Sequence, residues 1–475
     1  MKSNLPAQLP VRRILHLLFF LVCFIPNLRA QTIELGLSTR RSLPADWYGY
    51  DMSTTTRNNV SCASVDLKNH LPALKAKFLR FPSGSFANWY DWHQGWYVNS
   101  PYLPPWDASL TKIPNKLEDF KGLLNVNGGG AIIDLNMLTS NIRDQIAMLK
   151  HADSIGIPID HIELGEEFYL EGDDEDTSLV LGNYPTPESY GDTASRWIDS
   201  LRKYFPNSKI AAQGVFEKNK DPRRSAWNDA VIPKLNGKQD AMTFHYYYAA
   251  AYGDTTETDS QKLDFNATDL PDMFYQPYKA WGILHDKSLA KLPAGKEAWI
   301  TEYNLSDHNR PVHGTWASGI YTALHTMQLL QDDRITKITL HGVNGKAVFG
   351  AYFFSTDGFL YGLDPDAHYV GPANPPQTEL WGLNAYGHTM TMMGIALDGQ
   401  TYASRIEFSP NPQVTCVEAG KSIDYNGIFG YLFNKASGSQ AIIVNVTGTT
   451  QTLHTNVMFP QGGTYEMRYA PPLNL

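Results

Sequence analysis

The sequence predicts an α/β fold: a (β/α)₈ barrel of the TIM type followed by a small C-terminal β-sandwich. Strand-like and helix-like segments alternate along most of the chain, which is the rhythm of a parallel sheet with helical crossovers. After about residue 396 the strands instead follow one another through turns, as in a sandwich. An open doubly wound sheet is the alternative, but it needs a glycine-rich nucleotide-binding turn after an early strand, and the sequence has none.

Eight strand-like segments precede the change of rhythm, and eight parallel strands close a barrel. They are centred near residues 48, 79, 133, 163, 211, 243, 300 and 339. We therefore assign residues 31–395 to the barrel and 396–475 to the sandwich. The sandwich strands are expected at 402–408, 427–433, 440–446 and 465–469, and a further strand at 32–37 is able to join them.

The first thirty residues have the pattern of a secretory signal. Lys2, Arg12 and Arg13 form a basic region, an apolar run follows, and Ala30 ends a small-residue cleavage site. We predict a mature chain beginning at Gln31 and a secreted, periplasmic or cell-surface location; an uncleaved anchor is the alternative. The apolar run is too short for a membrane span, so we expect none after cleavage.

The acidic composition disfavours nucleic acid as a partner. Removal of residues 1–30 takes away four basic and no acidic residues, leaving 35 basic against 48 acidic side chains, a net charge of −13. No spacing of Cys and His indicates a zinc site, and no metal or organic cofactor is implied. Cys62 and Cys416 remain after cleavage, either as a disulfide or as two separate buried thiols.

Two of the strand-like segments run directly into glutamates. The fourth, residues 161–164, leads to Glu166 and Glu167, and the seventh leads to Glu302. Catalytic groups of a barrel lie at the carboxyl ends of its strands. Two facing carboxylates can cleave a glycosidic bond, since one protonates the leaving oxygen and the other attacks or activates water. The alternative is that Glu167 and Glu302 are both solvated surface carboxylates.

Four segments, taken together, resemble clan A glycoside hydrolases. They are FLRFPSGSFANWYDW at 78–92, ELGEEF at 163–168, FHYY at 244–247 and WITEYN at 299–304. The most similar families are the α-L-arabinofuranosidases and the heparanase/β-glucuronidase-like enzymes. The resemblance spans residues 45 to 345 and implies an exported, retaining glycoside hydrolase that acts on poly- or oligosaccharides.

The resemblance also implies roles for single residues. Glu167 corresponds to the acid/base and Glu302 to the nucleophile. Arg80 would hold Glu302 ionised, although an ion pair with Glu163 is an equal alternative. The acid/base is expected to have a raised pKa.

Further residues are implied as contacts to the sugar or the nucleophile. His245 and Tyr246 would position Glu302 or the sugar, and the alternative for His245 is a core histidine. Candidate sugar contacts are Asn88, Trp89 and Trp316, with core packing as the alternative for the tryptophans.

The chain departs from the family pattern at Glu166, where the family has Asn. The Asn amide donates a hydrogen bond to the sugar, whereas an ionised carboxylate can only accept one. Glu166 is therefore predicted to contact substrate, to raise the pKa of Glu167, or to mark altered or lost activity. The last reading gives the alternative function, a barrel that binds glycan without cleaving it. A purely structural cell-surface module is a third reading.

Overall fold

The computed structural model describes most of the chain after the N-terminal segment. The described residues are 32–52, 60–100, 103, 112–170, 177–218, 221–249, 269–306, 312, 315–344, 350–354, 380–383, 385–435 and 438–455. The predicted signal, residues 1–30, and the predicted strand at 465–469 lie outside these ranges. No helix among the described residues is long and apolar enough to cross a bilayer.

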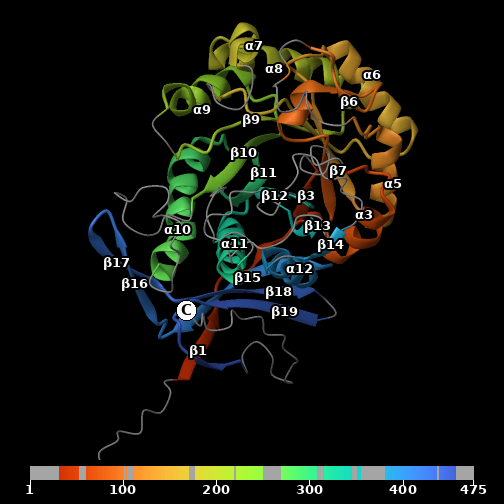
Figure 1. The fold of residues 1–475 in the computed structure, drawn as a ribbon. Helices are drawn as coiled ribbons and strands as arrows, with labels where there is room; N and C mark the ends of the chain where they lie inside the picture. Colours follow the sequence, from red (N-terminus) through yellow and green to blue (C-terminus); the bar gives the residue numbers. More distant parts are fainter. Residues whose placement is uncertain are drawn as a thin grey trace, which may run out of the picture.

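Eight parallel strands form a closed barrel, as predicted (Figure 1). All eight predicted strand centres fall inside or at an observed strand. The strands are β3 (Tyr48–Asp51), β4 (Phe78–Phe81), β7 (Gly130–Leu135), β8 (His161–Leu164), β9 (Lys209–Gln213), β10 (Ala241–Tyr248), β11 (Glu297–Leu305) and β12 (Ile335–His341). The barrel closes where β12 pairs with β3, with Ile338 opposite Tyr48. Aliphatic and aromatic side chains of these strands are almost wholly buried, which is why their sequences read as continuous apolar runs.

Helices surround the barrel and complete the crossovers between its strands (Figure 1). They are α3 (Val65–His70), α5 (Leu117–Asn127), α6 (Ile142–Ser154), α7 (Thr177–Asn183), α8 (Pro187–Arg202), α9 (Pro222–Leu235), α10 (Leu270–Ile283), α11 (Trp316–Gln328) and α12 (Ala385–Leu397). Several begin at a residue whose side chain accepts a hydrogen bond from a backbone N–H of the first turn. Thr186 caps α8, Asp221 caps α9 and Thr315 caps α11.

The C-terminal strands form a separate sheet below the barrel, antiparallel except where β1 pairs with β20 (Figure 1). Its strands are β15 (Tyr402–Ser409), β18 (Ile428–Lys435), β19 (Gly438–Asn445), β20 (Thr452–His454) and β1 (Thr32–Leu37), with β2 (Arg41–Ser42) at one edge. β1 lies between β15 and β20, so the first described strand is part of this sheet. A hairpin of β16 (Gln413–Glu418) and β17 (Lys421–Asn426), which we did not predict, packs against α10.

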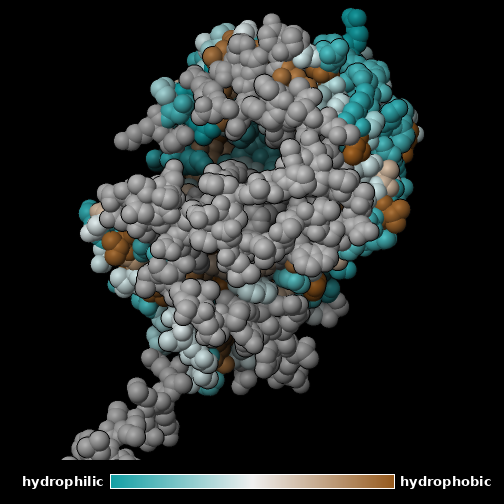
Figure 2. Space-filling view, in the orientation of Figure 1, coloured by the Kyte–Doolittle hydropathy of each residue, from teal (hydrophilic) through white to brown (hydrophobic). Residues whose placement is uncertain are grey.

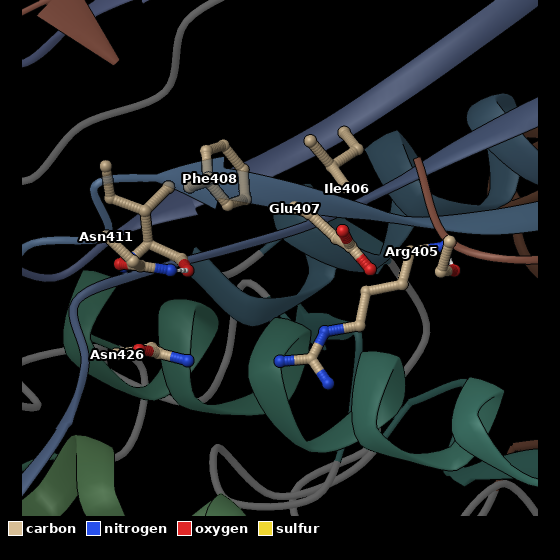
Figure 3. A pocket seen from close by; sticks show the side chains of 8 residues that line it. Arg405, Ile406, Glu407, Phe408, Asn411 and Asn426 are labelled. Carbon is tan, nitrogen blue, oxygen red and sulfur yellow. Dashed lines mark hydrogen bonds between the residues drawn. The ribbon is translucent and has the colours of Figure 1, made fainter. Parts of the chain in front are cut away.

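A hollow of about 430 Å³ lies beside β15 (Figure 3). Arg405, Glu407 and Asn426 contribute its polar lining. None of the residues predicted to bind or cleave a sugar borders it. The two remaining cysteines, Cys62 and Cys416, are both buried free thiols, which decides between the two alternatives for them.

We predict that Gly49→Ala destabilises the barrel. A methyl group at Gly49 would lie 2.5 Å from the backbone oxygen of Phe78 on the neighbouring strand β4, so the two strands would have to separate. Overpacking of this kind costs roughly 1–3 kcal/mol of unfolding free energy, measurable by urea denaturation. Gly282→Ala in α10 is the control, because nothing lies within 4 Å of its added methyl. Equal stability of the two variants would contradict this close approach.

Candidate active site

Arg80 lies at the centre of the barrel and binds five carboxyl groups. Its Nη1 is 2.9 Å from Asp51 Oδ2 and 2.7 Å from Glu302 Oε1, and its Nε is 2.7 Å from Glu163 Oε2. Its Nη2 is 3.0 Å from Asp134 Oδ2 and also contacts Glu166 Oε2. The arginine side chain is fully buried. Both ion pairs considered from the sequence, with Glu163 and with Glu302, are therefore present.

These charged groups converge because they lie on different strands of one closed barrel. Asp51 is the last residue of β3, Arg80 lies in β4, and Asp134 lies near the end of β7. Glu302 lies in β11, where Arg80 and Tyr247 reach its two oxygens. A parallel barrel brings such positions into one layer.

The turn after β8 sets the direction of the two adjacent glutamates. Gly165 has φ +76°, and a side chain there would come within 2.6 Å of the Phe168 ring. Glu167 has φ +50°, a left-handed conformation that is uncommon for a residue other than glycine. Gln213 accepts the backbone N–H of Phe168 at 2.9 Å, and Asn88 donates to the backbone oxygen of Glu166 at 2.9 Å. The turn is thus held from both sides.

Glu167 and Glu302 face each other across His245. His245 Nδ1 is 2.8 Å from Glu167 Oε1 and 3.6 Å from Glu302 Oε2. These two carboxylate oxygens therefore lie at most 6.4 Å apart, the total of the two distances that meet at Nδ1. The Glu167 side chain is 23% exposed and that of Glu302 is 5% exposed. The structure thus brings together the two carboxylates that the sequence singled out.

The pKa of Glu167 differs from the sequence-based expectation. Burial by itself raises this pKa, but the positive charge of His245 and the hydrogen bonds from His245 and Tyr169 outweigh burial and lower it to about 2. Burial alone would lower the pKa of His245. The negative charges of Glu302 and Glu167 outweigh burial, so this pKa is raised. Both shifts favour an ion pair between His245 and Glu167 in the free protein. The prediction that Glu167 has a raised pKa is wrong for this state.

The tyrosine that contacts Glu302 is Tyr247, and the prediction of Tyr246 for this position is wrong. The Tyr247 hydroxyl donates to Glu302 Oε2 at 2.8 Å. The Tyr246 ring instead stacks on His325 of α11, with ring centroids 3.9 Å apart. Successive side chains of a strand point to opposite faces, so only one of the two can join His245 inside the barrel.

The three remaining predicted contacts occupy different environments. Asn88 is buried and holds the turn at Glu166, as described above. Trp89 has no exposed surface and belongs to the hydrophobic core, so the stacking role predicted for it is corrected to packing. Trp316 is half-buried at the start of α11, stacked on His388. Its role in sugar binding stays a prediction.

Besides Tyr169 and Tyr247, which contact the two glutamates, sequence reasoning missed three ionisable residues of barrel strands in the site, Asp51, Asp134 and His341. His341 Nδ1 is 3.2 Å from Asp51 Oδ1 and 3.5 Å from Glu302 Oε2. Burial lowers the pKa of His341, but Asp51 and Glu302 outweigh burial and raise it. All three lie within the last residues of barrel strands. The rule that selected Glu302, namely that functional groups of a barrel lie at the carboxyl ends of its strands, would therefore have found these three residues as well.

Within the part of the chain that the structure describes, two groups of side chains have ligand atoms close enough together to bind a metal ion. They are Asp51, Glu302 and His341, and Glu163, Glu166 and His245. Arg80 contacts carboxylates of both groups and already supplies positive charge there. A cation would be repelled by this guanidinium, so the residues fit a metal poorly.

The fold matches those of known glycoside hydrolases. A family 51 α-L-arabinofuranosidase from Bifidobacterium longum has a TM-score of 0.64 at 12% identity, over 91% of this chain and 89% of its own. The GH51 arabinofuranosidase from Xanthomonas axonopodis pv. citri has 0.61 at 13%, covering 88% and 86%. A 4-O-α-L-rhamnosyl-β-D-glucuronidase from Fusarium oxysporum 12S has 0.52 at 15%, covering 88% and 81%.

No protein-family model and no curated protein sequence matches the chain. At identities of 12–15% the structural matches establish the fold and nothing finer. The chain therefore has the barrel and C-terminal sheet of these solved glycoside hydrolases, which agrees with the fold that the four sequence segments predicted.

We predict that Arg80→Met lowers the unfolding free energy by roughly 3–5 kcal/mol at pH 7, because it leaves buried carboxylates without their common cation. Burial already holds the folded-state pKa values of Asp134 and Glu166 above their unfolded values near 4, and loss of the cation raises them further. Stability of the variant should then fall as pH rises from about 4, since the unfolded state ionises first.

The control is Arg202→Met, which removes a half-exposed ion pair with Asp240 and should cost at most about 1 kcal/mol. Urea denaturation of both variants between pH 4 and 7 makes the comparison. An Arg80 variant as stable as the Arg202 variant at pH 7 would show that the buried cluster is not held by Arg80.

Proposed function

We propose that the protein is a retaining glycoside hydrolase that cleaves glycosidic bonds of poly- or oligosaccharides. The observation that carries this proposal is the facing pair Glu167 and Glu302, since Glu167 Oε1 and Glu302 Oε2 are at most 6.4 Å apart, the sum of their distances to His245 Nδ1. Carboxyl groups about 5–5.5 Å apart support a retaining mechanism, whereas an inverting enzyme needs about 6.5–9.5 Å to place a water. The upper limit of 6.4 Å, which follows from the two distances to His245, favours the retaining mechanism.

Glu302 is assigned as the nucleophile. Arg80 Nη1 donates to one of its oxygens at 2.7 Å and the Tyr247 hydroxyl donates to the other at 2.8 Å. Both oxygens are thereby fixed in direction, so one of them can attack the anomeric carbon of a bound sugar and form a glycosyl ester. The leaving oxygen departs on the side of Glu167.

Glu167 is assigned as the acid/base, with His245 as the source of its proton. The proton moves from His245 Nδ1 to Glu167 Oε1 over a contact of 2.8 Å and then to the leaving oxygen. A carboxylate with a pKa near 2 cannot donate a proton unaided at neutral pH. A substrate that excludes water from the mouth favours the neutral pair over the ion pair, since separated charges are stabilised by solvent.

Figure 2 shows hydrophilic surface inside a recess over the region where β9 and β10 lie in Figure 1. A sugar ring with several hydroxyls suits such a surface. The alternative function is a barrel that binds glycan without cleaving it. Two departures from the family pattern support this alternative. Glu166 stands where the family has Asn, and the pKa of Glu167 is low.

We predict that the wild type hydrolyses aryl glycosides and that the first product keeps the anomeric configuration of the substrate. Glu167→Gln should lower kcat by about 10²–10⁴-fold, and Glu302→Gln should abolish turnover because no nucleophile remains. Proton NMR of the nascent sugar gives the configuration. The structural neighbours make aryl arabinofuranosides and aryl glucuronides the first substrates to test.

Inversion of configuration would overturn the retaining mechanism. No turnover by the wild type on any glycoside, together with glycan affinity that both variants keep, would instead support the binding protein. Glu118→Gln, a half-exposed carboxylate that pairs with His151, is the control and should leave kcat unchanged.

We predict that Tyr247→Phe lowers kcat/KM by about 10–100-fold, because Glu302 loses a hydrogen bond to a charged oxygen. Tyr246→Phe is the matched control, since the Tyr246 ring packs against His325 and not in the site. Steady-state kinetics of the Tyr247→Phe and Tyr246→Phe variants tests this prediction. A larger loss in the Tyr246 variant would mean that the assignment of the two strand faces is reversed.

A further inference from the structure

Four of the five carboxyl groups around Arg80 form two unequal pairs, and the fifth, Glu163, lies on Nε. Asp51 and Glu302 share its Nη1, while Asp134 and Glu166 share its Nη2. Each pair faces one nitrogen of the same guanidinium. The pairs differ in what else they contact, and this difference determines where protons reside.

The pair at Nη1 receives several further hydrogen bonds. Asp51 accepts from the Ser83 hydroxyl and lies 3.2 Å from His341 Nδ1. Glu302 accepts from the Tyr247 hydroxyl at 2.8 Å. Burial raises the pKa of Asp51, but His341, Arg80 and Ser83 outweigh it and hold this pKa well below its usual value. Such donors stabilise charged carboxylates.

The pair at Nη2 lacks comparable donors. Asp134 Oδ1 is buried and accepts no hydrogen bond from any described residue. Glu166 Oε1 lies 3.8 Å from His245 Nδ1, beyond hydrogen-bond distance. Two buried carboxyls that share one nitrogen cannot both ionise without strong mutual repulsion. At least one proton is therefore expected on this pair.

The charges of the whole site lead to the same conclusion. Among the described residues, the six carboxyl groups of the site form ion pairs with three cationic side chains, Arg80, His245 and His341; the carboxyl groups are Asp51, Asp134, Glu163, Glu166, Glu167 and Glu302. Arg224 adds a fourth positive charge, which acts on Glu167. Burial raises the pKa of Glu166; Arg80 opposes this rise, and Glu302 and Asp134 add to it, so that the net pKa is well above its usual value. The pKa of Asp134 is raised in the same way, by burial first.

We propose that Glu166 is a neutral carboxylic acid in the working enzyme and donates a hydrogen bond from Oε1 to a hydroxyl of the bound sugar. The donor role rests on the proposed glycosidase function. Arg80 holds Oε2, and Asn88 holds the backbone oxygen of the same residue, so the side chain has a fixed direction. Oε1 is left beside His245 Nδ1, the atom that also reaches both Glu167 and Glu302.

That location places Oε1 at the border of the space between the two catalytic carboxylates. A neutral carboxyl offers one donor and one acceptor, as an amide side chain does, whereas a carboxylate offers acceptors only. Neutral Glu166 can therefore donate a hydrogen bond, as the Asn of the family pattern does. The proton also removes one negative charge from beside Glu302, which favours an attacking carboxylate next to a substrate rich in oxygens.

The first test of the proposal is infrared difference spectroscopy at pH 7. The spectrum of the wild type minus that of Glu166→Gln should contain the carbonyl stretch of a protonated carboxylic acid. Glu118→Gln is the control, because hydrogen bonds from His151 and its own backbone lower the pKa of the Glu118 carboxyl, so its spectrum should differ only in carboxylate bands. Glu166→Asn provides a second amide variant, and near-ultraviolet circular dichroism checks that each variant folds.

The second test is kinetic, with the same aryl glycosides. Both amide variants should keep kcat/KM within about tenfold of the wild type, whereas Glu166→Ala, which has no donor, should lose more than about tenfold. A loss in Glu166→Gln as large as in Glu166→Ala overturns the donor role. Absence of the protonated-acid band overturns the proposal whether or not the protein turns over glycosides. The band without any turnover would leave the proton on Glu166 and overturn the donor role together with the proposed function.

Discussion

The buried ion cluster of Arg80 is the interaction on which the candidate active site depends. One guanidinium donates to carboxyl groups from β3, β7, β8, β11 and the turn after β8. Burying these charges is costly unless each finds a partner. The planar fork of arginine presents its donors in fixed directions, so it can meet several carboxylates at once where a lysine could not. The cluster thereby fixes the position of Glu302 and of the residue beside Glu167.

Among the described residues, the site contains more carboxyl groups than cationic side chains. We infer that protons bound to some of these carboxyl groups reduce the excess negative charge. Side chains rich in donors surround Glu302 and Asp51, while Asp134 and Glu166 have few. His245 connects this cluster to Glu167, which is the most exposed of the carboxylates in contact with it. Donors fix Glu302, the proposed nucleophile, and Glu167, the proposed acid/base, lies at the more open edge; this arrangement suits the proposed two-carboxylate mechanism.

The sequence predicted the barrel because its signal is local. Apolar runs alternate with helical patterns, and all eight strands follow from that rhythm. Glu167, Glu302 and Arg80 were found because strand ends and four short segments point to them. The side chains of the β16–β17 hairpin alternate between polar and apolar, but its strands are short and mostly exposed, and we did not predict it.

Contacts between distant strands were beyond sequence reasoning. Tyr246 was chosen over Tyr247 because the segment resembled a His-Tyr pair, although the alternation of strand faces favours residues 245 and 247 together. The low pKa of Glu167 arises from a 2.8 Å contact with His245, 78 residues away in the chain. The five-carboxyl shell of Arg80 likewise exists only once the barrel is closed.

The most direct measurement of the central claim is to trap the glycosyl enzyme. In Glu167→Gln a dinitrophenyl glycoside, whose leaving group needs no acid, should still transfer its sugar, but hydrolysis of the ester should stall without the base. Mass spectrometry after an acid quench should find one added sugar, located on Glu302. A sugar on any other residue, or steady turnover with no covalent adduct, would contradict the pairing of Glu167 with Glu302.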